Sequence, residues 1–203
     1  MPPIKNLILD LGGVIMDIDF ALTHKAFEQQ GVPEFQNLYS QYAATSFFVN
    51  FEKGKVETRF FYDHIREICG CPLSDEVIRD CWNALLIGFD PAKLEWLQQV
   101  SSKYRTFLLS NTNILHYQAF AKMYYNIAGK EFNENFEKAY YSHEMGLRKP
   151  DAECYEAVLT EQNLQPAETL FIDDTFKNTE AAQALGLQVI HLAKPQTVLE
   201  LGI

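Results

Sequence analysis

Short apolar runs recur along the chain, and amphipathic stretches separate them. The runs are Asn6–Asp10, Thr106–Leu109, Leu170–Ile172 and Gln188–Leu192, with Lys138–Ser142 as a weaker candidate. Apolar runs of this length are typical of strands buried in a parallel sheet. Helices are predicted between them over Ile114–Ala128, Asp151–Leu164 and Asn178–Leu185. This alternation of strands and helices predicts an α/β fold with a doubly wound parallel sheet.

The segment between the first and second predicted strands is longer than a simple crossover requires. A crossover needs only about a dozen residues, whereas roughly residues 17–95 lie here. Apolar periodicity predicts helices over Phe20–Gln30, Val56–Ile68, Ser74–Leu86 and Pro91–Val100. We therefore expect an α-helical cap domain, residues 17–95, inserted into a core domain formed by residues 1–16 and 96–203.

Composition and charge exclude several classes of protein. The 203 residues are 47% hydrophobic and carry a formal net charge of −10, which indicates a globular chain whose surface repels nucleic acid. No stretch approaches the roughly 18–20 apolar residues of a membrane span, and Met1–Asn6 lacks the pattern of a signal peptide. The four cysteines lack the spacing of a zinc site, so reduced thiols and a cytoplasmic location are expected. No pattern indicates an oligomeric state.

Polar and acidic side chains follow three of the predicted strands. Asp10 closes the first, Ser110 and Asn111 follow the next, and Asp173 and Asp174 end another. Each one alone is typical of a turn or a helix cap. In a doubly wound sheet, however, ligands bind outside the carboxyl ends of the strands. Together these residues therefore form a candidate site.

These residue types match the needs of phosphate-ester hydrolysis. A carboxylate nucleophile, Asp10, divides the reaction into two steps through an acyl phosphate. Mg²⁺ held by Asp174, with Asp173 as an additional candidate, relieves the repulsion between that carboxylate and a phosphate dianion. Hydrogen-bond donors and a cation then hold the phosphoryl oxygens. The candidate phosphate-binding residues are Ser110, Asn111 and Lys149.

The same residues fall into four ordered motifs that cover nearly the whole chain. The motifs are Asp10–Val14, Leu109–Asn111, Gly146–Pro150, and Asp173–Asp174 with Asn178. With these motifs the sequence resembles the haloacid dehalogenase (HAD) superfamily of hydrolases. The position of the predicted insert is also similar to the helical cap of that family. The resemblance implies a HAD-like core, a helical cap and Mg²⁺ as cofactor.

The resemblance also implies a role for each position. Asp10 would be the nucleophile and a metal ligand, together with the main-chain carbonyl of Gly12 and with Asp174. Lys149 would be a catalytic residue that bridges the phosphate and Asp10. Many relatives have a second acid where this chain has Asn178, so this position departs from the pattern.

Longer matches within the motifs narrow the expected substrate. Asp10–Phe20, Leu109–Asn113 and Arg148–Pro150 resemble phosphatases that act on sugar phosphates. This implies a phosphomonoester hydrolase acting on a small phosphorylated metabolite, such as the sugar phosphate glucose 1-phosphate, through an aspartyl phosphate. Substrate choice is expected to reside in the cap. The candidates there are Phe47, Phe48, Phe51, Glu52 and Trp82.

Gly12 is the main departure from the family pattern. Phosphatases of this family usually have an aspartate two residues after the nucleophile, which protonates the leaving group and activates water. Loss of a general acid–base typically costs about 10²–10⁴-fold in rate. Asp17, Asp19 and Glu52 are candidates to replace it. Because an anomeric hydroxyl is a better leaving group than an ordinary alcohol, sugar 1-phosphates are expected to react faster than 6-phosphates.

Three alternative functions stay open at this point. Gly12 is compatible with a catalytically weak or inactive phosphate-binding module that has a regulatory role. A 2-haloacid dehalogenase also uses an aspartate nucleophile, but it needs no metal and leaves Asp173 and Asp174 without a purpose. A phosphomutase normally requires the acid that Gly12 lacks.

Overall fold

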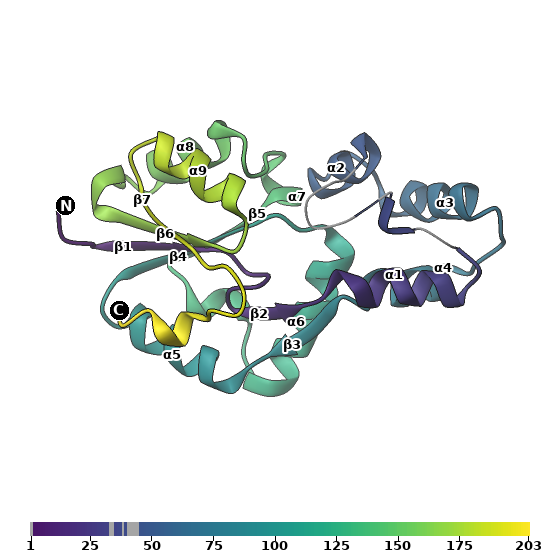
Figure 1. Ribbon diagram of the computed structural model, residues 1–203, viewed down its shortest axis with the longest axis horizontal. Helices are drawn as coiled ribbons and strands as arrows, with labels where there is room; N and C mark the ends of the chain where they lie inside the picture. The colour runs from purple at the N-terminus through teal and green to yellow at the C-terminus, as the bar shows by residue number, and fades with distance from the viewer. Residues whose placement is uncertain (1, 33–34, 38, 40–44) are drawn as a thin grey trace.

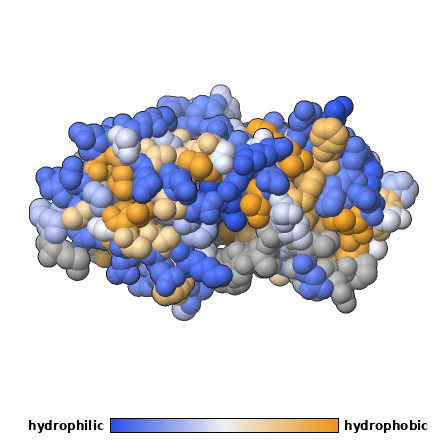
Figure 2. Space-filling view, turned by 90° about the horizontal axis from the view of Figure 1, so that it is seen from above, coloured by the Kyte–Doolittle hydropathy of each residue, from blue (hydrophilic) through white to orange (hydrophobic). Residues whose placement is uncertain are grey.

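The computed structural model describes residues 2–32, 35–37, 39 and 45–203 and has two lobes (Figure 1). A sheet flanked by helices forms the larger lobe, and a group of helices forms the smaller one. Seen from above in Figure 2, the surface is predominantly hydrophilic, with scattered apolar residues on both lobes. None of the described helices is long and apolar enough to cross a membrane.

Within the described ranges, the larger lobe is built on a sheet of five strands. They are β1 (Asn6–Leu9), β4 (Arg105–Ser110), β5 (Lys138–Tyr141), β6 (Thr169–Asp173) and β7 (Gln188–His191). Their order across the sheet is β5-β4-β1-β6-β7, and all neighbours are parallel. Each strand coincides with an apolar run from which a strand was predicted.

The direction of winding reverses at β1. From β1 the chain continues through β4 to β5 on one side, and then forms β6 and β7 on the other. Leu9 of β1 is level with Leu108 of β4 and Ile172 of β6. At such a switch point the carboxyl ends of neighbouring strands enclose a crevice. The residues that follow these three strands are thereby brought to one edge of the sheet.

Helices cover both faces of this sheet. They are α5 (Pro91–Ser101), α6 (Ile114–Ala128), the short α7 (Ser142–Met145), α8 (Ala152–Glu161) and α9 (Phe176–Ala184). In Figure 1, α8 and α9 lie on one face and α5 and α6 on the other. Because side chains alternate across a strand, Leu9 joins an apolar cluster with Phe120 of α6, while Ile8 joins a second cluster with Tyr155 of α8. The predicted doubly wound fold is confirmed.

The smaller lobe is inserted between two short strands that the sequence did not predict. The segment consists of β2 (Met16–Ile18), α1 (Phe20–Gln29), α2 (Ser46–Glu52), α3 (Thr58–Cys69), α4 (Asp75–Asn83) and β3 (Leu86–Phe89). β2 and β3 form an antiparallel ribbon. The helix predicted over Ser74–Leu86 ends at Asn83, because Leu86 pairs with Ile18 in the ribbon. We call α1–α4 the inserted helices; the division into domains at residues 17–95 stays a prediction.

An aromatic cluster around Trp82 connects the inserted helices to α6. The Trp82 ring is fully buried and lies 5.5 Å from the ring of Phe48 and 4.9 Å from that of Phe61. Its indole N–H donates to Oδ1 of Asn113, the N-cap of α6, at 3.2 Å. Its main-chain carbonyl lies 3.1 Å from Nε2 of His116. The first turn of α6 therefore joins the larger lobe to the inserted helices.

His116 is expected to make the stability of this contact depend on pH. Burial lowers the pKa of His116 to about 4, so the neutral ring donates to the Trp82 carbonyl. In the unfolded chain a histidine takes up a proton near its usual pKa of about 6.5, so the unfolded state binds more protons between pH 6.5 and 4. The free energy of unfolding should fall by up to about 3 kcal/mol as pH falls through this window. Urea unfolding of the wild type and of His116→Gln at several pH values tests this, and parallel profiles would contradict it.

Candidate active site

Asp10 follows β1 at the carboxyl edge of the sheet and is buried, with 8% of its surface exposed. Its Oδ1 accepts a hydrogen bond from the N–H of Leu11 at 2.7 Å and lies 2.8 Å from Nζ of Lys149. Burial raises the pKa of Asp10 to about 7; Lys149 opposes this shift, while Asp173 and Asp174 add to it. The site therefore strongly favours a positive partner for this carboxylate.

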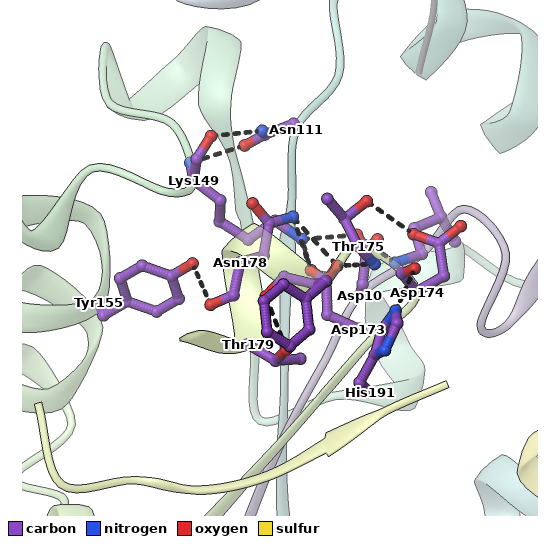
Figure 3. Close-up of polar contacts among 12 residues, drawn as sticks. Asp10, Asn111, Lys149, Tyr155, Asp173, Asp174, Thr175, Asn178, Thr179 and His191 are labelled. Atoms are coloured by element: carbon purple, nitrogen blue, oxygen red, sulfur yellow. Dashed lines mark hydrogen bonds and ion pairs between the residues drawn. The ribbon is translucent and has the colours of Figure 1, made fainter. Parts of the chain in front are cut away.

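Lys149 lies between two of the carboxylates (Figure 3). Its Nζ is 2.8 Å from Asp10 Oδ1 and 2.6 Å from Asp173 Oδ2, and its side chain is almost completely buried. Burial alone would lower the pKa of Lys149, but Asp10 and Asp173 raise it above its usual value. The Asn111 side chain donates to the Lys149 carbonyl at 2.8 Å and accepts from its N–H at 2.9 Å. Asn111 thus fixes the main chain from which the ammonium extends.

Asp173 and Asp174 end β6 and differ in their surroundings. Asp173 is fully buried and accepts bonds from the Thr175 N–H at 2.8 Å and from Asn178 Nδ2 at 3.0 and 3.1 Å. Asp174 is partly exposed and accepts a bond from the Thr175 hydroxyl at 3.1 Å. Tyr155 in turn donates to the Asn178 carbonyl at 2.9 Å. Asp173 is therefore committed to holding Lys149 and Asn178, whereas Asp174 lies at the cavity surface.

The three carboxylates form a cluster suited to a hard cation. One oxygen each from Asp10, Asp173 and Asp174 lies within 4.8 Å of the others. Oxygen ligands of this kind are what Mg²⁺ prefers in proteins. Gly13 permits the close approach, since its φ is +74° and a Cβ there would lie 2.3 Å from Asp174 Oδ2. A larger residue at this position would displace Asp174 from the cluster.

A cavity of about 610 Å³ opens above the cluster and extends to the inserted helices. Its lining residues are Asp10, Gly12, Ile18, Phe20, Tyr39, Val49, Glu52, Asn111, Arg148, Lys149, Pro150, Asp174, Thr175, Phe176, Lys177 and Asn178. The volume lies within the range of small-molecule sites. Another cavity of about 480 Å³, lined by residues 101–106 and 134–137, is more open and includes none of the predicted site residues. Most of the predicted site residues therefore line the cavity above Asp10.

The predicted phosphate-binding residues occupy different positions around this cavity. Asn111 and Lys149 line it, whereas Ser110 is buried at the end of β4 and is not part of the lining. Gly12, whose carbonyl is a predicted metal ligand, also lines the cavity. Their individual roles stay predictions. The structure adds Asn178, whose motif position was visible in the sequence but whose contact with Asp173 was not.

The space beside Gly12 is filled by a side chain from β2. A Cβ atom at position 12 would lie 2.7 Å from Cδ1 of Ile18. Of the three acids considered as replacements, Asp17 pairs with Lys93 at 2.5 Å, and Asp19 caps α1 by accepting from the Ala21 N–H at 2.9 Å. Glu52 is the one of the three that lines the cavity.

Most of the residues expected to select the substrate instead form the interior of the smaller lobe. Phe48, Phe51 and Trp82 are almost fully buried, and the ring of Phe47 lies 3.7 Å from that of His64, tilted by 34°. Within the described ranges, the inserted segment contributes five residues to the cavity. They are Ile18, Phe20, Tyr39, Val49 and Glu52. Tyr39 and Val49 carried no sequence signal that distinguishes a cavity residue from a packing residue, whereas Arg148 lay within the Gly146–Pro150 motif but had no role assigned to it.

Known proteins resemble the chain over most of its length. The family model of haloacid dehalogenase-like hydrolases matches residues 4–186. The D-ribitol-5-phosphate phosphatase of Bacteroides thetaiotaomicron is 30% identical over 185 residues, which cover 91% of this chain and 90% of the relative. A sesquiterpene phosphatase of Aspergillus oryzae is 28% identical over 143 residues, which cover 70% of each chain.

The fold is similar to solved structures of the same family. The crystal structure of a wild-type HAD family enzyme from Bacteroides thetaiotaomicron, in complex with magnesium and inorganic phosphate, superimposes with a TM-score of 0.88 and 34% identity. The match covers 98% of this chain and all of the other. On the evidence of the family model and these relatives, the chain belongs to the haloacid dehalogenase-like hydrolases.

Proposed function

We propose that the chain is a Mg²⁺-dependent phosphomonoester hydrolase that acts on a small sugar or polyol phosphate through an aspartyl phosphate. The observation that carries the proposal is the position of Asp10, which lines the cavity, lies 2.8 Å from Lys149 and belongs to the carboxylate cluster. Two relatives are named as phosphatases, and a similar solved structure holds magnesium and phosphate. These names support the same chemistry here.

The proposed ligands of Mg²⁺ are Asp10, Asp174 and the main-chain carbonyl of Gly12, with Asp173 as an additional candidate. The site fits a divalent cation because three clustered carboxylates face a single lysine, which leaves an excess of negative charge. When bound, the ion supplies the positive charge that offsets repulsion between the nucleophile and a phosphate dianion.

Asp10 and Lys149 carry out the proposed reaction in two steps. An oxygen of Asp10 first forms a bond to phosphorus while the bond from phosphorus to the alcohol oxygen breaks, and the departing alkoxide takes a proton from water. Water then attacks phosphorus, which releases inorganic phosphate and restores the carboxylate. Lys149 holds Asp10 in place, and its charge stabilises the phosphoryl oxygens. Ser110 and Asn111 are proposed to complete the phosphate site.

The finer proposal concerns the leaving group. Gly12 offers no acid to the departing alcohol, which favours esters whose alcohol leaves easily, such as the anomeric oxygen of glucose 1-phosphate. The substrate in the name of the 30% identical relative is instead the phosphate of a primary alcohol. Both kinds of ester therefore belong in the first assay.

The test is phosphate release from matched sugar 1-phosphates, sugar 6-phosphates and D-ribitol 5-phosphate in the presence of Mg²⁺. We expect EDTA to lower the rate by about 10²–10⁴-fold, because the ion contributes several kcal/mol to the transition state. Adding Mg²⁺ back should restore it. Metal-independent release of halide from a 2-haloacid would favour the dehalogenase alternative. Absence of release from every ester, in a folded protein that binds Mg²⁺, would favour the phosphate-binding module.

A further inference from the structure

One carboxylate on the cavity wall lies outside the acidic cluster. Glu52, the last residue of α2, lines the cavity with only 5% of its surface exposed. Its Oε1 accepts a hydrogen bond from the Tyr39 hydroxyl at 3.1 Å. Its Oε2 lies 2.9 Å from Nη2 of Arg148, which precedes the active-site lysine. A donor and an acceptor of opposite charge thus stand side by side, between the inserted helices and the core.

The position of Glu52 is fixed by the core. The Ser142 hydroxyl donates to the Glu52 carbonyl at 2.7 Å and accepts from the Thr112 N–H at 2.9 Å. Gly54 continues this contact, because its φ is +65° and a Cβ there would lie 2.1 Å from the His143 carbonyl oxygen. The carboxylate of Glu52 is therefore held at a defined place above the site.

The pair retains hydrogen-bonding capacity in a buried setting. Oε2 of Glu52 pairs with Nη2 of Arg148 at 2.9 Å, whereas Nε of Arg148 has no hydrogen bond within the described ranges. A buried polar atom left without a hydrogen bond costs about 1–3 kcal/mol. Both residues line the cavity, and a quarter of the Arg148 side chain is exposed. A ligand that both donates and accepts hydrogen bonds would complement the exposed part of this pair.

The chemistry of the pair indicates which ligand this is. A hydroxyl group both donates and accepts, so it can serve the carboxylate and the guanidinium together. A second phosphate or a carboxylate would be attracted by Arg148 but repelled by Glu52, which already occupies the guanidinium, and a plain hydrocarbon would leave both groups without hydrogen bonds. Ile18, Phe20 and Val49 on the same cavity supply apolar surface for the carbon chain. The wall is therefore complementary to a neutral, polyhydroxylated chain.

We propose that Glu52 and Arg148 bind hydroxyl groups of the substrate and select neutral polyol or sugar monophosphates over bisphosphates and hydroxyl-free esters. This inference rests on the proposed phosphatase function of the same cavity. It makes the two residues determinants of specificity, separate from the groups that act on phosphorus.

Steady-state kinetics with two esters separate recognition from chemistry. D-ribitol 5-phosphate carries several hydroxyls, whereas p-nitrophenyl phosphate carries no aliphatic hydroxyl. For Glu52→Gln and for Arg148→Met, kcat/KM with D-ribitol 5-phosphate should fall about 10–100-fold, mainly through a higher KM. With p-nitrophenyl phosphate it should change less than about threefold. Glu156→Gln, which alters an exposed glutamate of α8, is the matched control and should change neither.

Removing the negative charge of Glu52 gives a second test, in which substrate preference should change. A purely structural role of Glu52 would not change this preference. Glu52→Gln leaves the Arg148 guanidinium without its anionic partner. The activity on fructose 1,6-bisphosphate relative to D-ribitol 5-phosphate should therefore rise about tenfold or more in this variant. The same ratio should not rise in Arg148→Met, which lacks the cation.

Equal losses on both monophosphates in both variants would overturn the proposal and assign the pair to anchoring α2. A wild type that hydrolyses p-nitrophenyl phosphate but no polyol or sugar phosphate would overturn it while leaving the phosphatase function standing. A wild type that releases phosphate from no ester would refute the proposed function, and the inference with it. Thermal unfolding of each variant, together with its activity on p-nitrophenyl phosphate, reports whether it has folded.

Discussion

Replacement of Asp10 by asparagine is expected to abolish phosphate release and, at the same time, to stabilise the metal-free protein. Removing a nucleophile that forms a covalent intermediate should lower kcat by at least about 10⁴-fold. The amide cannot attack phosphorus and is a poor ligand for Mg²⁺ compared with a carboxylate. No residual activity should therefore respond to added metal.

The gain in stability follows from the pKa of Asp10. Burial raises this pKa from 3.8 to about 7 in the folded, metal-free protein. A carboxyl group whose pKa is higher in the folded than in the unfolded protein stabilises the fold fully at pH values below its unfolded pKa. This stabilisation is lost as the pH rises through its folded pKa. Asp10 should thus destabilise the fold increasingly between about pH 4 and 7. At pH 8 in EDTA, Asp10→Asn should be more stable than the wild type by roughly 1–3 kcal/mol.

Urea unfolding at pH 5 and pH 8, once in EDTA and once in Mg²⁺ without EDTA, measures this effect. The difference between the two proteins should be larger at pH 8, and Mg²⁺ should stabilise the wild type but not the variant. Asp80→Asn, at an exposed position on α4, is the control and should follow the wild type throughout. An Asp10→Asn protein that is less stable than the wild type at pH 8 would show that the buried, ionised Asp10 carboxylate does not destabilise the fold.

Restoring an acid at position 12 is expected to increase activity only when space is made for it. A Cβ at Gly12 would lie 2.7 Å from Ile18 Cδ1, and the next atom of that side chain is 3.6 Å away. Valine lacks the Cδ1 atom. The double variant Gly12→Asp/Ile18→Val should therefore raise kcat on alkyl phosphates about 10–100-fold, part of the usual effect of a general acid. Gly12→Asp alone should gain less, because Ile18 obstructs the new side chain.

The dependence on the leaving group distinguishes acid catalysis from a general change in the site. We would measure kcat for phosphate esters whose alcohols span a wide range of pKa values. The double variant should gain most with the least acidic alcohols and little with p-nitrophenyl phosphate. Ile18→Val alone is the control and should resemble the wild type. An equal gain on all esters would argue against proton transfer by the new aspartate.

The sequence predicted the sheet and the carboxyl edge of the site well, for a physical reason. Buried parallel strands require uninterrupted apolar runs, so strands such as β1 and β6 are visible as local patterns that end in Asp10 and Asp173. Helix α6 was predicted at its observed bounds, Ile114–Ala128, because Gly129 follows its end; in the structure Asn113 caps its start.

The features that the sequence did not predict depend on distant pairings. The strand β2 has only three residues, and its partner β3 is separated from it by the inserted helices, so neither has a local signal. Which of the candidate residues in the inserted helices face the cavity could not be predicted, for a related reason. Phe48, Phe51 and Trp82 are aromatic on an amphipathic segment, but apolar periodicity cannot tell a side chain that faces a cavity from one that faces a neighbouring helix. Only the tertiary fold places Glu52 next to Arg148.

The attachment of the α2 end to Ser142 and His143 has a consequence for how such a chain diversifies. In the described part of the chain, α3 and α4 contribute nothing to the cavity lining, whereas the end of α2 is held by the core. Duplicated copies can therefore accumulate substitutions at exposed positions of α3 and α4 without changing a residue that lines the cavity. Changes at the turn after α2 would alter substrate choice abruptly. Divergence in the smaller lobe is thus a poor guide to whether two relatives share a substrate, and the turn around residues 52–54 is a better one.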